Sequence, residues 1–237
     1  SVIRHETDLP RSQPDPSHGR AVQPPALSHR NHDVDFFTVP VLVSRLSGVA
    51  DQVNAVISRA LLEQHGWLER GDEMTVRGEV RTFNNRTGVG SRLVISVFVR
   101  ELVLEQGEDQ NRLVCTGTLC KPPSLRCTPL GRTICDMILA VNRRYGRSDY
   151  LPCIAWGSLA YQCGQMEVGE KLALEGRLQS RVYTKNLGSR CEERTAYEVS
   201  VMNLLPPSAD SLQGNTYSDF FEEDHGKMTK SGNVLHA

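Results

Sequence analysis

The chain has 237 residues, of which 39% are hydrophobic and 23% are charged, and its formal net charge is −1 at neutral pH. A chain of this length can bury a substantial core in one or two domains. It contains no apolar run near the roughly 20 residues of a membrane-spanning helix and no hydrophobic signal core, so we expect a cytoplasmic protein without membrane contacts.

The small net charge conceals an uneven distribution along the chain. Residues 112–206 hold 13 Lys and Arg against 8 Asp and Glu, a net of +5, whereas residues 18–106 hold 10 of each. An excess of cations in one half is the distribution expected if that half contacts a polyanion.

The chain contains an internal repeat. After a first stretch, 1–17, which is rich in Pro, Ser and charge and is expected to be disordered, positions 19–82 align without a gap on positions 117–180. The identities include Gly19/Gly117, Arg45/Arg143, Gly48/Gly146, Asp51/Asp149, Gly71/Gly169 and Gly78/Gly176. Many of them are Gly, where close approach or a positive φ constrains the backbone. The sequence therefore predicts two copies of one domain, at 18–106 and 112–206, joined by an acidic linker at 107–111.

Hydrophobic runs bounded by turn residues predict the same elements in each copy. In the first copy we expect strands near 20–27, 35–45, 52–58, 73–83 and 92–104, with a helix near 59–65. In the second we expect strands near 112–121, 133–142, 150–156, 171–183 and 194–204, with a helix near 158–165. Three strands, a helix and two strands is the order of the OB-fold, so the predicted fold is all-β, with two tandem five-stranded OB-fold barrels that each carry one short helix.

The fourth strand of the second copy shows two faces. Leu172, Leu174 and Leu178 share one parity and suit a core, whereas Arg177, Arg181 and Tyr183 share the other. One strand therefore presents two guanidinium groups and a phenol ring along an outward line.

The stretch 134–157 adds more cations and rings around a predicted hairpin. Cations interleaved with aromatic side chains suit a surface that holds phosphates while bases stack on the rings. The second copy offers candidate phosphate contacts at Arg126, Arg132, Arg143, Arg144, Arg147, Arg177, Arg181 and Lys185.

The segments LAVNRRY, SDYLPCIAWG and GRLQSRVY in this copy resemble the bacterial single-stranded DNA-binding protein family, in the tandem OB-fold form found in Firmicutes. The resemblance implies base-stacking rings at Tyr145, Tyr150, Trp156 and Tyr183. It also implies sequence-tolerant binding of single-stranded DNA in replication, recombination or repair, close to the nucleoid. Because family members present four OB folds per assembly, it implies a homodimer for this two-barrel chain.

The first copy looks degenerate by comparison. The repeat register places Ser47, Gln52, Ser58 and Asn85 opposite the four rings, and none of these side chains can stack as a ring does. Phe83 and Phe98 remain as alternatives. We expect weaker nucleic-acid contact in this copy, or a role in oligomer or partner contacts.

The remaining features favour neither catalysis nor a cofactor. Motifs of nucleophilic, metal-dependent and nucleotide-dependent enzymes are absent, and the seven Cys lack a zinc-ligand spacing, so we expect no enzyme, no metal and reduced thiols. Residues 207–237 are expected to form a disordered tail, in which the segment YSDFFEED with Phe220 and Phe221 could dock replication or repair proteins. An RNA-binding or primosome-type OB protein and an OB-fold scaffold for protein contacts are the alternative functions.

Overall fold

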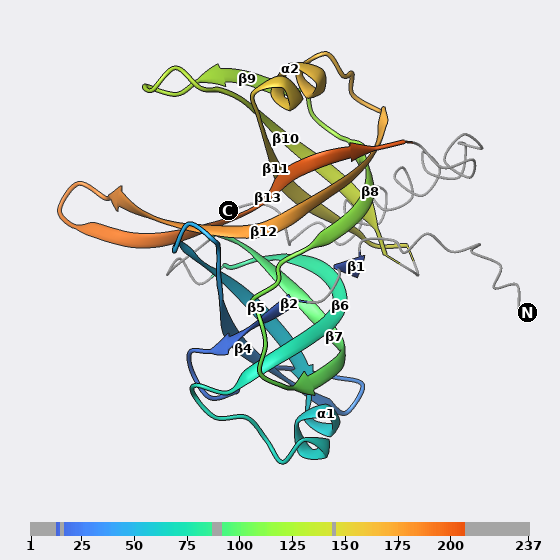
Figure 1. Cartoon of the computed structure of the whole chain (residues 1–237), viewed down its shortest axis with the longest axis vertical. Helices are drawn as coiled ribbons and strands as arrows, with labels where there is room; N and C mark the ends of the chain where they lie inside the picture. The colour runs from blue at the N-terminus through green and yellow to red at the C-terminus, as the bar shows by residue number, and fades with distance from the viewer. Residues whose placement is uncertain (1–12, 15–16, 87–91, 144–145, 207–237) are drawn as a thin grey trace, which may run out of the picture.

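The computed structural model describes residues 13–14, 17–86, 92–143 and 146–206. Almost all of them belong to two sheets, one from each copy of the repeat, which lie one above the other in Figure 1. Among the described residues, neither helix is long and apolar enough to cross a membrane.

The first copy forms a closed barrel. Its elements are β2 (Ser17–Ala21), β3 (Ala26–Asn31), β4 (Val34–Ser44), β5 (Ala50–Ser58), α1 (Arg59–Gln64), β6 (Glu73–Asn84) and β7 (Leu93–Leu104). The strand order is β2-β6-β7-β5-β4-β3, and an additional pairing between β2 and β4 closes the first five strands into a ring. β3 extends the sheet beyond the ring by pairing with β4.

The second copy repeats this architecture. Its elements are β8 (Leu113–Leu119), β9 (Ser124–Cys127), β10 (Thr133–Asn142), β11 (Ser148–Trp156), α2 (Ser158–Gly164), β12 (Lys171–Asn186) and β13 (Cys191–Leu205). The order β8-β12-β13-β11-β10-β9 is closed by a pairing between β8 and β10, and β9 extends the sheet as β3 does in the first copy. The chain therefore has the predicted all-β fold of two tandem OB-fold barrels, each with one short helix.

The segment before the first barrel and the linker between the barrels both pair with barrel strands. A two-residue strand, β1 (Gln13–Pro14), pairs with β8 of the second barrel. Regular structure therefore begins inside the segment 1–17 that was expected to be disordered, because β8 offers a free edge to it. The linker 107–111 returns to β2, where the backbone N–H of His18 donates to the carbonyl of Gln110 over 2.9 Å.

Alternating side chains fill the interior of each barrel. On β12, Leu172, Leu174 and Leu178 are buried, while Arg181 and Tyr183 are exposed on the opposite face, as the predicted parity requires. The aliphatic side chains of the other strands complete both cores; Val39, Val41, Ile57 and Leu62 do so in the first barrel and Leu139, Leu151, Leu174 and Val199 in the second.

A glycine bends the long hairpin of each barrel at the same place. Register shifts between Arg77 and Gly78 on β6 and between Glu175 and Gly176 on β12 mark β-bulges. A Cβ atom at Gly78 would overlap the carbonyl oxygen of Phe98, and one at Gly176 would overlap that of Ser200. The two glycines are identical in the repeat because both bulges bring a neighbouring backbone too close for any side chain.

Most predicted elements agree with the structure to within a few residues, but the strand predicted near 20–27 is wrong at its end, because β2 stops at Ala21 and a new strand, β3, begins at Ala26. β10 coincides with its predicted range, and α2 ends one residue before its predicted end. β3 and β9 were not predicted as separate strands. Both are short and largely exposed, so neither carries the hydrophobic alternation by which a strand is recognised.

Candidate nucleic-acid interface

Two rings point outward from β11 in the second barrel. Leu151, Cys153 and Ala155 are buried in the core, so the intervening positions of β11, including Tyr150 and Trp156, face away from it. Trp156 is 38% exposed and Tyr150 is half-buried. Trp156 is the last residue of β11, and Gly157, at φ 60°, turns the chain from there into α2.

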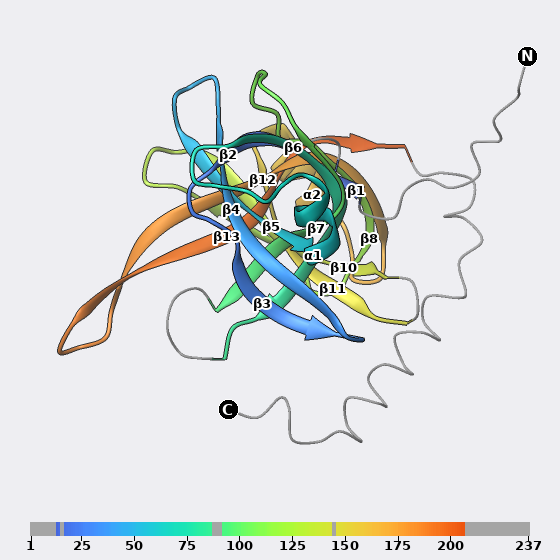
Figure 2. The same cartoon turned by 90° about the horizontal axis from the view of Figure 1, so that it is seen from below.

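A third ring lies on the hairpin of β12 and β13. This hairpin continues well beyond the barrel, to the pair Asn186 and Cys191 (Figure 1 and Figure 2). Tyr183 on β12 is 38% exposed, and the guanidinium of Arg181 lies 5.8 Å from the centre of its ring. Lys185 is exposed two residues further towards the tip. The hairpin therefore presents a ring between two cations.

Two predicted cations lie on the opposite side of Trp156, on the hairpin of β9 and β10. Arg126 on β9 forms an ion pair with Asp136 on β10, and this hydrogen bond raises the pKa of Arg126. Because both partners are about half exposed, the pair leaves the guanidinium accessible. Arg132 lies in the turn, whose backbone is closed by the bond from Thr128 N to Arg132 O.

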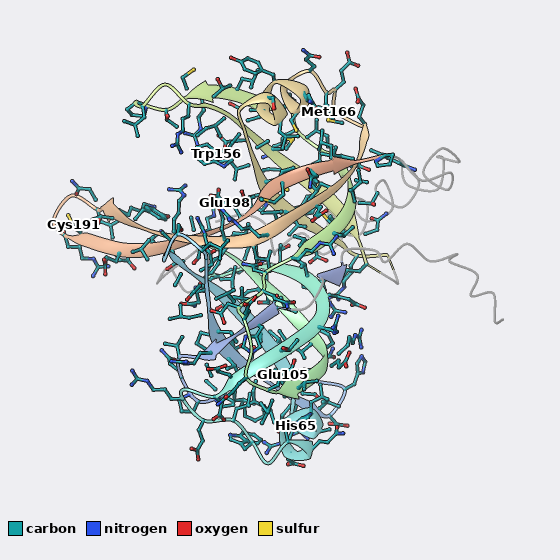
Figure 3. The ribbon with its side chains drawn as sticks, viewed as in Figure 1. His65, Glu105, Trp156, Met166, Cys191 and Glu198 are labelled. Atoms are coloured by element: carbon teal, nitrogen blue, oxygen red, sulfur yellow. The ribbon has the colours of Figure 1, made fainter. Side chains whose placement is uncertain are left out.

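These elements surround Trp156 on two sides. Figure 3 shows Trp156 between the β9–β10 hairpin above and the β12–β13 hairpin below, with Glu198 on β13 beneath it. Rings are thus placed on a surface bordered by two cationic hairpins, which is the arrangement that single-strand recognition requires.

This face also holds an acidic residue, Glu198, that was not among the predicted site residues. Glu198 precedes the buried Val199 on β13, so its side chain faces outward, where it accepts a hydrogen bond of 2.7 Å from Gln179. Its carboxylate also lies 3.9 Å from the guanidinium of Arg181. The alternation around Val199 and Val201 in the sequence was the available signal. The carboxylate reduces the positive charge available to a phosphate at Arg181.

Arg143, a predicted phosphate contact, is bound to a carboxylate where the two barrels meet. Its guanidinium binds both oxygens of Asp149, at 2.5 and 2.6 Å, and Asp149 is 1% exposed. The same carboxylate accepts a 2.8 Å hydrogen bond from the backbone N–H of Thr82, in the first barrel. Arg143 therefore belongs to the junction between the barrels.

The same set of contacts occurs a second time at the junction, with the roles of the two barrels exchanged. In the first barrel Arg45 binds both oxygens of Asp51, which is 1% exposed, and Asp51 accepts from the backbone N–H of Ser180 in the second barrel over 3.1 Å. Thr82 and Ser180 correspond in the repeat, as do the two Arg and the two Asp. The barrels therefore meet around a pseudo-twofold axis, and these repeat identities build the contact between them.

Arg177 also lies towards this junction. Burial lowers the pKa of its guanidinium, and the positive charge of Arg45 in the other barrel lowers it further. Arg147, by contrast, is exposed in the loop between β10 and β11, while Arg144 and Tyr145 of the same loop lie outside the described residues. The structure thus brings Tyr150, Trp156, Tyr183, Arg126, Arg132, Arg147, Arg181 and Lys185 to the surface of the second barrel and directs Arg143 and Arg177 to the junction.

The cysteines do not form a metal or redox centre in the described part of the chain. All seven are free thiols, and no group of three or more potential ligands lies close enough to hold a metal there. Burial raises the pKa of Cys115 to about 12 and that of Cys163 to about 11, so both remain protonated core side chains at neutral pH.

Comparison with known proteins points to one family. The profile of the "Single-strand binding protein family" matches residues 110–206. The "Single-stranded DNA-binding protein" of Halalkalibacterium halodurans is 31% identical over 117 residues, covering 46% of this chain and 70% of the relative. The protein of the same name from Clostridium tetani is 34% identical over 113 residues, covering 44% of this chain and 78% of the relative. The crystal structure of the single-stranded DNA binding protein from Thermus aquaticus has the same fold, with a TM-score of 0.65 and 21% identity, covering 86% of this chain and 95% of the other.

Proposed function

This chain belongs to the single-strand binding protein family, and on that premise we propose that it binds single-stranded DNA through the outer face of its second barrel. As a member of this family it is a DNA-binding protein and not an enzyme. The observation that carries the assignment is the outward position of Trp156, Tyr150 and Tyr183 on one barrel, between hairpins that carry exposed cations. We further propose that this barrel is the domain 112–206, that 18–106 is the other domain, and that 107–111 links them.

The site residues divide into two roles in this proposal. Tyr150, Trp156 and Tyr183 stack bases, since an aromatic ring offers a face to any base without reading its identity. The exposed cations hold the phosphates, with the strongest contributions from side chains that lack a short ion pair to a carboxylate. These roles account for binding that tolerates any sequence, as protection of exposed strands in replication, recombination and repair requires. Tyr145 and Arg144 keep their predicted roles in stacking and phosphate contact.

Replacement of Tyr183 tests the proposal with little effect on the core. Tyr183→Ala removes an exposed ring, and we expect the affinity for oligo-dT to fall by about 1–3 kcal/mol, the range for one stacked base. Tyr161→Ala is the matched control, because Tyr161 is also exposed, at 56%, but lies on α2 rather than on the strands that carry the proposed site. Fluorescence anisotropy with labelled oligo-dT measures both. Equal affinities for the parent and Tyr183→Ala, with Trp156→Leu also unchanged, would contradict the proposed site.

Assembly, the tail and location extend the same proposal. Members of this family are typically oligomeric, and we propose that two chains associate to give four barrels. Light scattering at micromolar concentration should give the mass of a dimer, and a mass of 26.4 kDa, that of one chain, would contradict this.

Phe220 and Phe221 lie outside the described residues and stay a predicted docking segment for replication or repair proteins. The protein would act on DNA in the cytoplasm, at the nucleoid.

A further inference from the structure

The first barrel carries a cluster of rings and cations on its own outer face. His29 on β3 stacks on Phe36 of β4, with ring centres 5.0 Å apart and an interplanar angle of 14°. Phe36 in turn lies 5.3 Å from Phe98 on β7. The guanidinium groups of Arg81 and Arg100 lie 4.1 and 4.9 Å from the centre of the Phe98 ring. We call these five residues the first-barrel platform.

The platform occupies the position in the first barrel that corresponds to the position of Trp156 in the second. We call a row of directly paired residues across neighbouring strands a rung. In the second barrel, Trp156 of β11 is paired with Ile134 of β10. At the corresponding rung of the first barrel, Ser58 of β5 is paired with Phe36 of β4. Directly paired residues on neighbouring strands present their side chains on the same face. The ring missing at Ser58 is therefore replaced by a ring on the adjacent strand, which a comparison position by position does not detect.

The neighbouring strands of this rung match as well. In the second barrel Ile134 is paired with Arg126 of β9, and in the first Phe36 is paired with His29 of β3. Phe98 is the partner of Val56, next to Ser58 on the outward side of β5. The first barrel therefore gathers its rings at the rung that carries Trp156 in the second barrel.

Phe36 and Phe98 are not needed to fill the core. Their neighbours Phe37, Val97 and Val99 point inward and are buried, whereas Phe36 and Phe98 are half-buried on the outward side and His29 is exposed. Ring clusters on an outward sheet face, left partly open to solvent, are suited to receive another flat apolar group.

The charge of the platform is positive and held in place. Glu79 lies 3.1 Å from Arg81 and 3.4 Å from Arg100. Burial raises the pKa of Glu79, but the two guanidinium groups outweigh it and lower the pKa overall, so the carboxylate is ionised at neutral pH. Two cations against one anion leave a net positive charge, and the guanidinium of Arg100 is 58% exposed. Guanidinium planes that cover a ring can both stack on a base and contact a phosphate.

The platform lies close to the junction with the second barrel. Ser96, two residues before Phe98 on β7, is buried although its side chain faces outward. On β5 the backbone N–H of Gln52 donates to the hydroxyl of Ser180 in the second barrel over 2.7 Å, and its side chain reaches the hydroxyl of Tyr197. The outer face of the first barrel is therefore covered at Ser96 and partly open at Phe98. These two residues are two positions apart on β7, which is about 7 Å along a strand.

We propose that the first-barrel platform is a second single-strand-binding site, which takes bases of the same DNA strand that occupies the second barrel. This inference rests on the proposed function of the second barrel. It assigns to His29, Phe36 and Phe98 the stacking of bases and to Arg81 and Arg100 the contacts with the adjoining phosphates.

Replacement of the rings by leucine tests the stacking. Phe36→Leu and Phe98→Leu keep an apolar side chain at each position but remove the aromatic face, and Tyr161→Leu is the matched control for loss of an exposed ring elsewhere. Two probes are used, an oligo-dT of about 8 nucleotides, which fits one OB-fold site, and one of about 35, which can span two. We expect unchanged affinity for the short probe and a loss of about tenfold or more per variant for the long probe, since one stacked base is lost.

The results separate the two proposals. If the parent binds neither probe, the proposed function fails. If the parent binds both probes and Trp156→Leu weakens both, but Phe36→Leu and Phe98→Leu bind the long probe as tightly as the parent, only the second site fails. Urea denaturation of each variant identifies any that does not fold.

Replacement of an exposed cation tests the platform without touching a ring. Arg100→Gln should weaken binding of the long probe and reduce the magnitude of its log–log salt slope by about 0.7, the value for one phosphate contact on a single strand. Arg20→Gln is the matched control, because Arg20 is also exposed and paired with one carboxylate, Glu73, but lies away from the platform. Equal effects of the two variants would show a general charge effect and overturn the second site.

Discussion

At the scale of the single residue, His18 couples the linker to the first barrel by its charge. Its Nε2 lies 3.0 Å from the carbonyl oxygen of Glu105, and its Nδ1 lies 3.2 Å from a carboxylate oxygen of Asp109. Both partners only accept hydrogen bonds, so both contacts can be hydrogen bonds at the same time only when the ring is an imidazolium. Burial lowers the pKa of His18, but these two bonds and the charges of Asp109 and Glu73 raise it above 6.5 overall.

This geometry predicts a stability that depends on pH. Because the pKa of His18 is higher in the folded than in the unfolded protein, its contribution is complete below the unfolded value of 6.5 and is lost as pH rises through the folded pKa. The urea midpoint of the parent should therefore fall, on raising the pH from below 6.5 through the folded pKa, by more than that of His18→Gln. Parallel pH profiles for the two proteins would show that His18 is neutral in the fold.

The residue scale also shows where sequence reasoning about the site succeeded and where it stopped. Strand parity placed Tyr183 and Arg181 outward and the leucines of β12 inward, and the structure agrees. The pairing of Arg143 with Asp149 could not be inferred, because it depends on how the loop between β10 and β11 closes against Thr82 of the other barrel. Phe36 was missed because its role depends on its cross-strand partner, and no alignment of one copy on the other shows which residues share a rung.

At the scale of the element, the bulge at Gly176 sets the bend of the β12–β13 hairpin that carries Tyr183. Gly176→Ala would bring a Cβ into the carbonyl oxygen of Ser200, and we expect the free energy of unfolding to fall by about 1–3 kcal/mol, the usual range for overpacking. Gly107→Ala is the control, since its Cβ would find nothing nearer than 3.7 Å and Gly107 has an ordinary φ. Urea denaturation measures both variants. An unchanged midpoint for Gly176→Ala would mean that the hairpin can shift to accommodate the methyl group.

Elements were easier to predict than their pairing. Hydrophobic runs bounded by turn residues located the ten barrel strands and both helices, because each of these elements contributes side chains to a barrel core. β3 and β9 escaped notice because their side chains are mostly exposed. These two strands nevertheless place His29 and Arg126 beside the rung at which each barrel presents its ring.

At the scale of the whole molecule, the paired carboxylates at the junction should couple the two barrels. Asp149→Asn leaves the guanidinium of Arg143, which is 24% exposed, without its countercharge, and we expect a loss of about 3 kcal/mol in the free energy of unfolding, as for a broken buried pair. Asp136→Asn is the control, because its pair with Arg126 is about half exposed and should contribute less than about 1 kcal/mol. Calorimetry should show the parent's unfolding transition separating into two in Asp149→Asn. Coincident traces for the parent and Asp149→Asn would indicate that the barrels do not depend on this contact.

The pseudo-twofold junction has a further consequence because a short linker joins its halves. Two barrels tied by a few residues meet at an effective concentration in the millimolar range. Their contact therefore survives dilution that would separate two free subunits. Every molecule also contains one first barrel and one second barrel. In a homodimer both subunits have the same sequence and present the same surface. In this chain the two barrels have different sequences and are always present in a one-to-one ratio. The two halves can therefore differ in their rings and charges within one molecule, as they do where a tryptophan on β11 and a phenylalanine on β4 occupy the same rung.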